Sequence, residues 1–507
     1  MFTVTEDIFG WITEFLLRTP MEDLLKRVLA VFPLPDKDLC LKKAALLRAN
    51  IAMDAQKAVD TPPTTVLMLP WIGYGHLSAY LELAKALSRR NFHVYFCSTP
   101  VNLDSIKPNL IPPPSSIQFV DLHLPSSPEL PPHLHTTNGL PSHLKPTLHQ
   151  AFSAAAQHFE AILQTLSPHL LIYDSLQPWA PRIASSLNIP AINFNTTAVS
   201  IIAHALHSVH YPDSKFPFSD FVLHDYWKAK YTTADGATSE KTRRGAEAFL
   251  YCLNASCDVV LVNSFRELEG EYMDYLSVLL KKKVVSVGPL VYEPSEGEED
   301  EKYWRIKKWL DEKEALSTVL VSFGSEYFPP KEEMEEIAHG LEESEANFIW
   351  VVRFPKGEES SRGIEEALPK GFVERAGERA MVVKKWAPQG KILKHGSIGG
   401  FVSHCGWNSV LESIRFGVPV IGVPMHLDQP YNAGLLEEAG IGVEAKRDAD
   451  GKIQRDQVAS LIKQVVVEKT REDIWKKVRE MREVLRRRDD DMMIDEMVAV
   501  ISVVLKI

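Results

Sequence analysis

Short apolar runs rich in β-branched and aromatic residues alternate with amphipathic helical patterns along most of this 507-residue chain. A strand followed by a turn and a helix is the repeat of a right-handed βαβ unit with parallel strands. In the first half we expect strands at residues 65–69, 93–98, 117–121, 170–173 and 191–194. In the second half we expect them at 318–322, 348–353, 380–384, 400–404 and 418–423. The pattern predicts an α/β protein with two Rossmann-like domains.

An acidic segment joins the two predicted domains. Residues 293–302 read EPSEGEEDEK, a polar sequence that cannot bury much apolar surface. The predicted division is an N-terminal extension of uncertain role (1–60), a first domain (61–290), a linker (291–303), a second domain (304–480) and a C-terminal segment that packs back on the first domain (481–507). Ligands bind beyond the carboxyl ends of parallel strands, so facing domains predict a site in the cleft between them.

The extension does not follow the strand–helix repeat. Helical patterns at 7–17, 21–32 and 37–50 are separated by Pro20, Pro33 and Pro35. One interpretation is a segment that binds a membrane surface or a partner. The other is an appendage upstream of an alternative start at Met53, and we favour this second interpretation.

Composition excludes several classes of partner. The net charge of -11 argues against nucleic-acid binding, which requires a concentrated basic surface. The five cysteines lack metal-type spacing, as expected in a reducing compartment, and Asp489–Asp491 and the histidine-rich stretches do not predict a metal site either. No apolar run is long enough to span a bilayer, and Glu6 and Asp7 stand where a secretory signal would be basic. We expect a cytoplasmic monomer without stable membrane insertion.

A turn near His404 is predicted to bind an anion. The expected strand at 400–404 is followed by a tight turn and by a helix capped by Asn408 or Ser409. A helix N-terminus offers unpaired N–H groups and the positive end of the helix dipole, which suits a diphosphate. A second cradle is expected at residues 323–325, which end in Ser325, and His404 can add a hydrogen bond or a proton-linked charge.

Other groups around this turn suit a sugar nucleotide. Trp386 can stack on a base such as uracil, and the backbone of Ala387 can contact the edge of that base. Glu412 follows Asn408 by one helical turn and can reach ribose hydroxyls beside the phosphates. The polar pair at 428–429 can bind the hydroxyls of the sugar.

The 44-residue segment 386–429 closely resembles the signature box of plant family 1 UDP-glycosyltransferases, and the resemblance extends from about residue 64 to the C-terminus. It implies a GT-B fold, a UDP-sugar donor and inverting, metal-independent transfer. Lys385, Gly390 and Gly396 depart from the family pattern and affect the stiffness of the loop rather than its polar groups. The donor-binding residues implied by the motif are Ser325, Trp386, Ala387, Gln389, His404, Trp407, Asn408, Ser409, Glu412, Asp428 and Gln429, with Trp407 acting mainly through its backbone.

A catalytic pair is expected in the first domain. His76 ends the turn after the first strand, directly before a helical pattern at 77–89, and a helix N-terminus disfavours imidazolium. Asp174 follows another strand of the same sheet and can orient His76 as a general base. The family resemblance assigns the same roles to this His and Asp. The alternatives are a structural turn histidine and a strand-terminal cap.

The acceptor is not identified by spacing. Residues 133–140, Trp179, 194–197 and 215–221 can line an acceptor pocket or simply pack. Residues 171–181, 323–328 and 424–430 resemble the family branch that glycosylates sugars already attached to a natural product, most of all the cucurbit glucosyltransferases that extend the sugar chains of mogrosides, which are triterpenoid glycosides. The resemblance therefore implies UDP-glucose-dependent formation of a β-glucoside on a glycoside acceptor.

There is one alternative within the same enzyme class, and there are two alternatives from other classes of protein. A flavonoid, lignan or terpenoid aglycone is an alternative acceptor. An oxidoreductase would need a G-x-G-x-x-G turn after the first strand, whereas this chain has Gly73, Gly75 and then His76. A non-catalytic UDP-sugar-binding module would not need His76 and Asp174.

Overall fold

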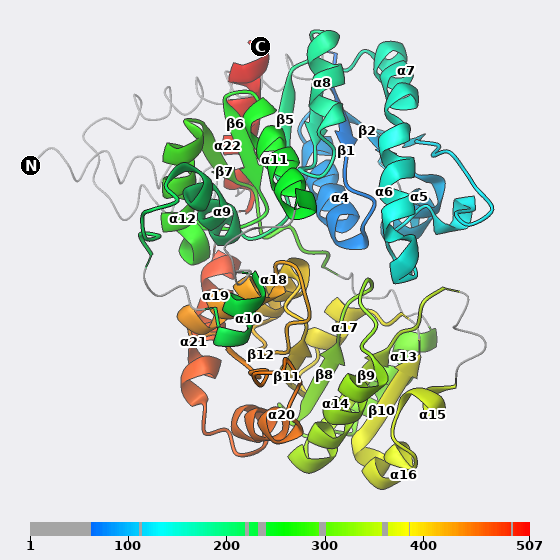
Figure 1. Cartoon of the computed structure of the whole chain (residues 1–507), viewed down its shortest axis with the longest axis vertical. Coiled ribbons are helices and arrows are strands. Elements are labelled where there is room, and N and C mark those ends of the chain that lie inside the picture. Colours follow the sequence, from blue (N-terminus) through cyan, green and yellow to red (C-terminus); the bar gives the residue numbers. More distant parts are fainter. Residues whose placement is uncertain are drawn as a thin grey trace, which may run out of the picture. The chain divides into compact units, whose positions relative to one another are not determined.

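The computed structural model describes residues 62–110, 114–218, 223–231, 240–293, 301–356, 363–384, 386–487 and 490–506. Thr64–Ile507 forms one compact unit. The predicted extension at 1–60, as well as Lys385, lies outside the described residues. Two separate parallel sheets organise the compact unit, so the predicted α/β architecture is confirmed (Figure 1).

The first sheet has seven parallel strands in the order β3-β2-β1-β4-β5-β6-β7. The strand order reverses between β1 and β4, where Val66 pairs with Leu170 and Leu69 with Tyr173. The crevice at such a reversal is where ligands bind in open α/β sheets. The strands are β1 (Thr64–Leu69), β2 (Phe92–Ser98), β3 (Ile117–Asp121), β4 (Leu170–Tyr173), β5 (Ala191–Asn195), β6 (Val259–Val262) and β7 (Lys283–Ser286).

The second sheet has six parallel strands in the order β10-β9-β8-β11-β12-β13. Its reversal lies between β8 and β11, where Ser322 pairs with Ser403 at the carboxyl ends. The strands are β8 (Thr318–Ser322), β9 (Asn347–Val352), β10 (Ala380–Lys384), β11 (Ile398–Ser403), β12 (Val420–Gly422) and β13 (Gly442–Glu444). Each sheet therefore has one switch point, and each switch point lies beside the first strand of that half of the chain.

Helices flank both sheets (Figure 1). In the first half they are α4 (Tyr74–Ser88), α5 (Pro100–Ile106), α6 (Lys145–Ala154), α7 (Ala156–Leu166), α8 (Trp179–Ser186), α9 (Val199–His210), α10 (Asp225–Tyr231), α11 (Glu240–Ala255) and α12 (Arg266–Leu280). In the second they are α13 (Glu301–Asp311), α14 (Lys331–Ser344), α15 (Ile364–Ala367), α16 (Phe372–Ala376), α17 (Gln389–Leu393), α18 (Trp407–Phe416), α19 (Gln429–Glu438), α20 (Arg455–Ile462), α21 (Glu472–Arg487) and α22 (Asp490–Leu505).

The sequence-based strands lie where they were expected, with ends displaced by up to two residues. Three further strands, β6, β7 and β13, were not predicted. They have only three or four residues each, but β4 and β12, which were predicted, are equally short, so length alone does not explain the omission. Helix α13 begins at Glu301, inside the predicted linker 291–303.

Buried clusters cover both faces of the first sheet and also join the two sheets. On one face, Ile494, Met497 and Ile501 of α22 pack with β1 and α4. The residues from α9 and α12 share another buried cluster with those from α18, α19 and α21. The two halves are thus held together by a common apolar core.

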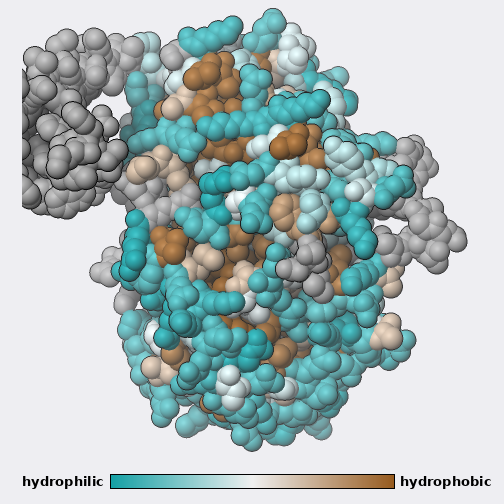
Figure 2. All heavy atoms as spheres, turned by 90° about the vertical axis from the view of Figure 1, so that its left-hand side faces the viewer, coloured by the Kyte–Doolittle hydropathy of each residue, from teal (hydrophilic) through white to brown (hydrophobic). Residues whose placement is uncertain are grey.

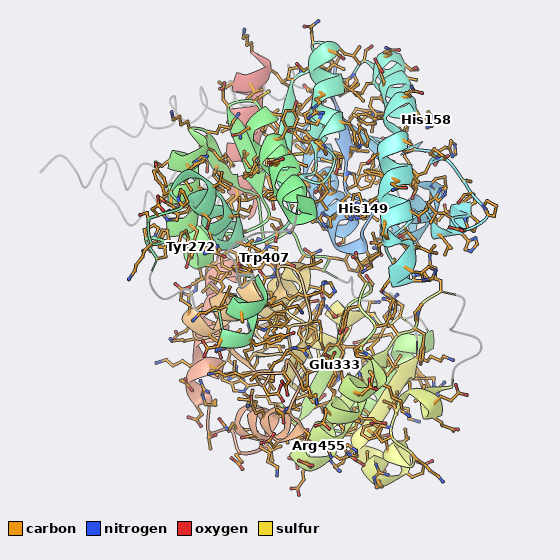
Figure 3. All side chains as sticks on the ribbon, in the orientation of Figure 1. His149, His158, Tyr272, Glu333, Trp407 and Arg455 are labelled. Atoms are coloured by element: carbon orange, nitrogen blue, oxygen red, sulfur yellow. The ribbon has the colours of Figure 1, made fainter. Side chains whose placement is uncertain are left out.

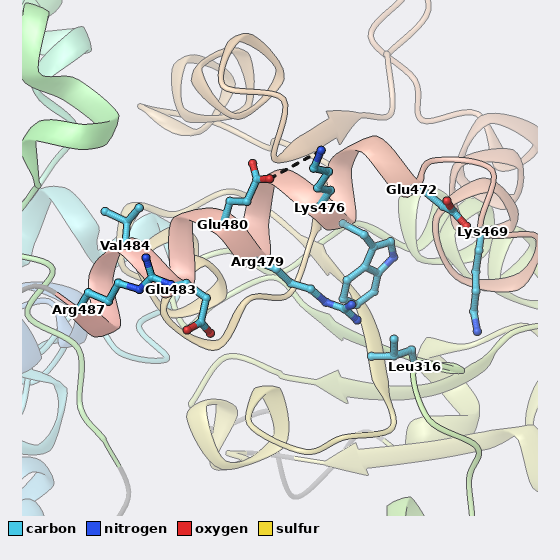
Figure 4. Close-up of a pocket in the computed structure, with 10 residues that line it drawn as sticks. Leu316, Lys469, Glu472, Lys476, Arg479, Glu480, Glu483, Val484 and Arg487 are labelled. Atoms are coloured by element: carbon cyan, nitrogen blue, oxygen red, sulfur yellow. Dashed lines mark ion pairs between the residues drawn. The ribbon is translucent and has the colours of Figure 1, made fainter.

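The molecular surface is mixed in polarity. The face in Figure 2 is mainly hydrophilic, with hydrophobic patches between hydrophilic groups. Among the described residues, no helix has both the length and the apolar character needed to cross a membrane. A pocket of about 710 Å³ lies along α21 and is lined mostly by charged side chains such as Lys476, Arg479 and Glu480 (Figure 4). None of its lining residues belongs to the predicted site.

Candidate active site

Three neighbouring strands of the first sheet deliver polar side chains to one edge. His76 follows β1, Asp174 follows β4 and Thr196 follows β5. Helix α4 begins at Tyr74, three residues earlier than its apolar pattern indicates, so His76 lies within its first turn rather than before it. The switch point between β1 and β4 thereby brings His76 and Asp174 together.

His76 and Asp174 are in direct contact. Nδ1 of His76 lies 2.7 Å from Asp174 Oδ2 and 2.9 Å from Thr196 Oγ1. Asp174 is 2% exposed and also accepts a hydrogen bond from the backbone N–H of Trp71 at 3.3 Å. A carboxylate at Nδ1 favours the tautomer with the proton on Nδ1 and the lone pair on Nε2. Nε2 has no hydrogen-bond partner in the described part of the chain.

The pKa of His76 is raised above its ordinary value. Burial by itself lowers the pKa, but the Asp174 carboxylate, through its charge and hydrogen bond, and the more distant charges of Glu326 and Asp428 outweigh burial. The sequence predicted that the helix N-terminus disfavours imidazolium at His76. With all neighbouring charges included, the pKa of His76 shifts in the opposite direction. The nearby carboxylates make His76 a stronger base than an isolated imidazole.

The anion-binding turn is built by close backbone packing around His404. Gly406 is the N-cap of α18 and Gly417 ends the helix, so the predicted cap at Asn408 or Ser409 is wrong by two or three residues. A Cβ on Gly324 or on Gly406 would lie 2.6 Å from His404 Nε2, and only glycine permits both approaches. The loop after β8 and the start of α18 therefore enclose one imidazole.

His404 is uncharged near neutral pH. Burial, together with the nearby His426, lowers its pKa to about 4. Its buried Nδ1 has no hydrogen-bond partner. The imidazole edge that carries Nε2 faces Gly324 and Gly406, so Nε2 and the unpaired N–H groups at the start of α18 are suited to an oxygen-rich ligand. Of the two roles expected for His404, hydrogen bonding fits and a resident charge does not.

A second polar group lies at the start of α17. Gln389 Nε2 donates to Glu412 Oε2 at 2.8 Å and to Ser409 Oγ at 3.1 Å. Burial raises the pKa of Glu412 to about 7. Trp386, which precedes this group, is 46% exposed, whereas Ala387 is buried. An exposed indole at Trp386 and a partly buried carboxylate at Glu412 are the groups expected for a base and a ribose.

The Asp428–Gln429 pair is partly occupied by contacts within the protein. Asp428 Oδ2 accepts hydrogen bonds from Asn432 Nδ2 at 3.0 Å and from Thr197 Oγ1 at 3.1 Å. Gln429 Oε1 accepts from the backbone N–H groups of Met425 and His426. Gln429 can therefore offer a ligand its amide N–H groups rather than its oxygen.

Asn408 and Trp407 of the predicted donor set also contact the first half of the chain. Asn408 Nδ2 donates to the carbonyl of Gly75, next to His76, at 2.5 Å. Trp407 is buried, and its indole N–H donates to the carbonyl of Asn263 at 2.8 Å. Figure 3 shows Trp407 at the level where the two halves meet. The sequence predicted that Trp407 acts mainly through its backbone. It did not predict the hydrogen bond of the indole, which connects the two halves.

Thr196 and Glu326 lie in the segments 194–197 and 323–328 noted in the sequence, but neither residue was given a role of its own. Thr196 could have been found, because it follows β5 at the same edge as His76 and Asp174. Glu326 gave no such signal, since it lies in the loop after β8 and meets the first half only in the folded chain. It accepts a hydrogen bond from Thr137 Oγ1 at 2.6 Å.

One group outside this site has the composition of a cation site. Among the described residues, His224, Glu437 and Glu444 bring ligand-type atoms within 4.8 Å of one another. The His224 ring and the Glu437 carboxylate are in hydrogen-bond contact at 3.1 Å, and Glu444 Oε1 accepts from the Trp227 indole at 3.2 Å. These contacts account for the cluster as a structural link between α10 and the second half.

Comparison with known proteins identifies the family. The family model for UDP-glucoronosyl and UDP-glucosyl transferases matches residues 305–480, and the model for the glycosyltransferase N-terminal domain matches residues 63–292. A protein from Siraitia grosvenorii, Mogroside IIIx synthase, is 75% identical over 90% of this chain and 96% of its own length. The chain belongs to the plant family 1 UDP-glycosyltransferases. It is an enzyme of that class, and its two-sheet architecture is the GT-B fold.

Two further relatives place this similarity in context. The beta-D-glucosyl crocetin beta-1,6-glucosyltransferase of Gardenia jasminoides is 51% identical over 80% of this chain and 91% of its own length. The structure of Phytolacca americana UGT2 complexed with UDP-2fluoro-glucose and pterostilbene matches with a TM-score of 0.67 at 26% identity. The match covers 86% of this chain and 99% of that chain. The whole of the compact unit is therefore typical of the family.

Proposed function

We propose that this enzyme transfers glucose from UDP-glucose to a sugar hydroxyl of a triterpenoid glycoside of the mogroside type, with inversion at the anomeric carbon. The contact between His76 Nδ1 and Asp174 Oδ2 carries the catalytic part of this proposal, because it leaves Nε2 free to act as a base. Support for the acceptor comes from the 75% identity to Mogroside IIIx synthase.

The proposed reaction is a direct displacement. His76 Nε2 removes the proton of the acceptor hydroxyl while the acceptor oxygen forms a bond to the anomeric carbon. The bond from that carbon to the diphosphate oxygen breaks, and its electron pair leaves with UDP. The Asp174 carboxylate stabilises the imidazolium as it forms. General base catalysis of this kind contributes about 10²- to 10⁴-fold.

Stabilisation of the leaving diphosphate is assigned to protein groups without a metal. The N-terminus of α18, Ser325 and His404 Nε2 are the proposed donors. A single helix N-terminus contributes only about 0.3–2 kcal/mol, so several donors acting together are required. Gln389, Ser409 and Glu412 are assigned to the ribose and Trp386 with Ala387 to the uracil, while Asp428 and Gln429 are assigned to glucose.

An already glycosylated acceptor is favoured over an aglycone. The Gardenia relative is named for the transfer of glucose to a glucosyl group, and the Siraitia relative for the synthesis of a mogroside. The first name states a glycosylated acceptor, and the second states a glycoside as the product. We extend that acceptor class to this chain.

The proposal is tested by incubating the enzyme with UDP-glucose and separate mogrosides, other glycosides and free aglycones, and by following the gain of one hexose by mass spectrometry. We expect the mogrosides to gain hexose fastest. Gain by free aglycones alone would rule out the acceptor class. Retained UDP binding with lost transfer in His76→Ala separates an enzyme from a non-catalytic binding module.

Location and assembly also belong to the proposal. Scattered cysteines favour a reducing compartment, and we propose a cytoplasmic monomer. Light scattering of the purified enzyme and fractionation of the source tissue are the corresponding measurements.

A further inference from the structure

Glu326 lies beside the catalytic pair, although it belongs to the second half of the chain. The loop after β8 carries it to Gly73, where a Cβ would lie 2.9 Å from Glu326 Oε1. The same oxygen accepts the hydrogen bond from Thr137 Oγ1 at 2.6 Å. Glu326 is also close enough to raise the pKa of His76. Its carboxylate is therefore held against the turn that carries the base.

The loop around Glu326 is fixed by backbone contacts with the first half. The carbonyl of Ser325 accepts from the backbone N–H of Gly139 at 3.0 Å, and the carbonyl of Glu326 accepts from Lys145 Nζ at 3.0 Å. The lysine thus bonds the main chain of Glu326, not its carboxylate. Among the described residues no cation forms an ion pair with that carboxylate, and Oε2 retains its full capacity to accept hydrogen bonds.

Sheet order separates Glu326 from the sugar-binding pair assigned to the donor. Glu326 follows β8, whereas Asp428 follows β12, two positions along the second sheet. Across the site, Glu326 meets Thr137, and Asp428 meets Thr197 after β5. Neighbouring strands lie about 4.8 Å apart, so two strand steps exceed the reach of one hydroxyl. The two carboxylates are therefore held by different residues of the first half, Thr137 and Thr197.

We propose that Glu326 Oε2 accepts a hydrogen bond from a hydroxyl of the acceptor's terminal sugar and so aligns the neighbouring, attacking hydroxyl with His76. A carboxylate is a charged hydrogen-bond acceptor, so it forms strong bonds to sugar hydroxyls and discriminates against a ligand that lacks them. An apolar aglycone cannot supply that hydroxyl. This inference rests on the proposed function and adds a residue that selects a glycoside over an aglycone.

The test compares Glu326→Gln with the wild type and with Glu312→Gln, which changes an exposed glutamate at the end of α13. Steady-state kinetics are measured with UDP-glucose and a mogroside, and UDP affinity is measured by calorimetry. We expect kcat/KM for the mogroside to fall about tenfold or more in Glu326→Gln, with the loss mainly in acceptor KM. UDP affinity and the Glu312→Gln kinetics should stay within about twofold of wild type.

Two further variants examine orientation. Glu326→Asp keeps the charge and should recover part of the lost kcat/KM. Thr137→Val removes the hydrogen bond that orients the carboxylate, so it should raise acceptor KM without weakening UDP binding. An unchanged acceptor KM in Glu326→Gln overturns the assignment, and an equal loss of UDP affinity makes Glu326 a donor-side residue instead. If wild-type enzyme transfers glucose to no glycoside, the proposed function itself fails.

Discussion

At the residue scale, the environment of His76 determines the pH dependence of the reaction. The pKa of His76 is raised by Asp174, and a general base must be unprotonated to act. We therefore expect kcat/KM to fall as the pH drops through a value above the ordinary histidine pKa of about 6.5. In Asp174→Asn this acid limb should move to lower pH, because the neutral amide no longer stabilises the imidazolium.

The accompanying loss of rate gives a second readout. Asp174→Asn should reduce kcat/KM by about 10²-fold or more, since the base is no longer held in its reactive tautomer. Asp104→Asn, in an exposed pair with Lys107, is the matched control and should have the kinetics of the wild type. An acid limb at the same pH in wild type and Asp174→Asn would contradict the assignment of that limb to His76.

Glu412 predicts a pH dependence of donor binding. Its pKa of about 7 is raised by burial, so the carboxylate loses its charge as the pH falls through neutrality. The ionised form accepts hydrogen bonds from ribose hydroxyls at both oxygens and more strongly, whereas the protonated form uses one oxygen as a donor. We expect UDP affinity, measured by titration calorimetry, to weaken below about pH 7 in the wild type.

The ionisation of UDP itself contributes to such a profile, and Glu412→Gln isolates the protein contribution. This variant should bind UDP more weakly at high pH and should lose part of the pH dependence. His404, with a pKa of about 4, does not titrate in this range. Identical pH profiles for wild type and Glu412→Gln would exclude Glu412 from ribose binding.

At the element scale, α10 connects parts of the chain that are distant in sequence. Figure 1 shows this helix among elements of the second half, although it belongs to the first. Trp227 of α10 is 1% exposed, donates to Glu444 of β13, and lies under the Arg447 guanidinium. Tyr226 packs so closely on Gly451 that a Cβ there would collide with its ring. Helix α10 is thus attached to the second half by a buried aromatic side chain.

Removing this side chain should destabilise the fold. Truncation of a buried tryptophan costs about 3–5 kcal/mol, so Trp227→Ala should lower the melting temperature measured by circular dichroism. Trp227→Phe keeps most of the apolar volume and should lower it less. Asp225→Asn changes a fully exposed side chain of the same helix and should leave it unchanged. A Trp227→Ala enzyme as stable as the wild type would show that this contact does not support the fold.

At the scale of the whole molecule, the shared core predicts joint unfolding of the two halves. Helices α9 and α12 are buried in one cluster with α18, α19 and α21, and Thr64–Ile507 is one compact unit. If either half unfolded alone, the apolar surface of the other half in this cluster would be exposed to water, which is unfavourable. We expect a single calorimetric transition that moves to higher temperature with UDP.

The size of that shift follows from linkage. UDP at about 100 times its Kd stabilises the folded form by about 2.7 kcal/mol if it binds only that form.

A variant can weaken the contact between the two halves. Trp407→Phe removes the hydrogen bond to Asn263 and should broaden or split the calorimetric transition. Two transitions in the wild type, of which UDP moves only one, would contradict joint unfolding.

The extent of sequence-based prediction can be followed at particular positions. Strand periodicity located β1, β4, β8 and β11, which carry the site, because buried parallel strands are continuous apolar runs. The same reasoning missed β6, β7 and β13, although β4 is as short as β6 and β7. It placed His76 and Asp174 correctly at strand ends, but misjudged the direction of the His76 pKa shift because three carboxylates from distant segments contribute to it.

The sequence alone determined the fold class and the family, since both are encoded by local periodicity and by a contiguous 44-residue segment. Tertiary structure decided which groups remain available for ligands: Gln429 uses its oxygen within its own loop, and His404 turns Nε2 toward the loop after β8 and the start of α18. It also decided that Glu326 meets Thr137 across 189 positions of sequence. Such contacts depend on how two sheets pack, and spacing along the chain carries no information about that packing.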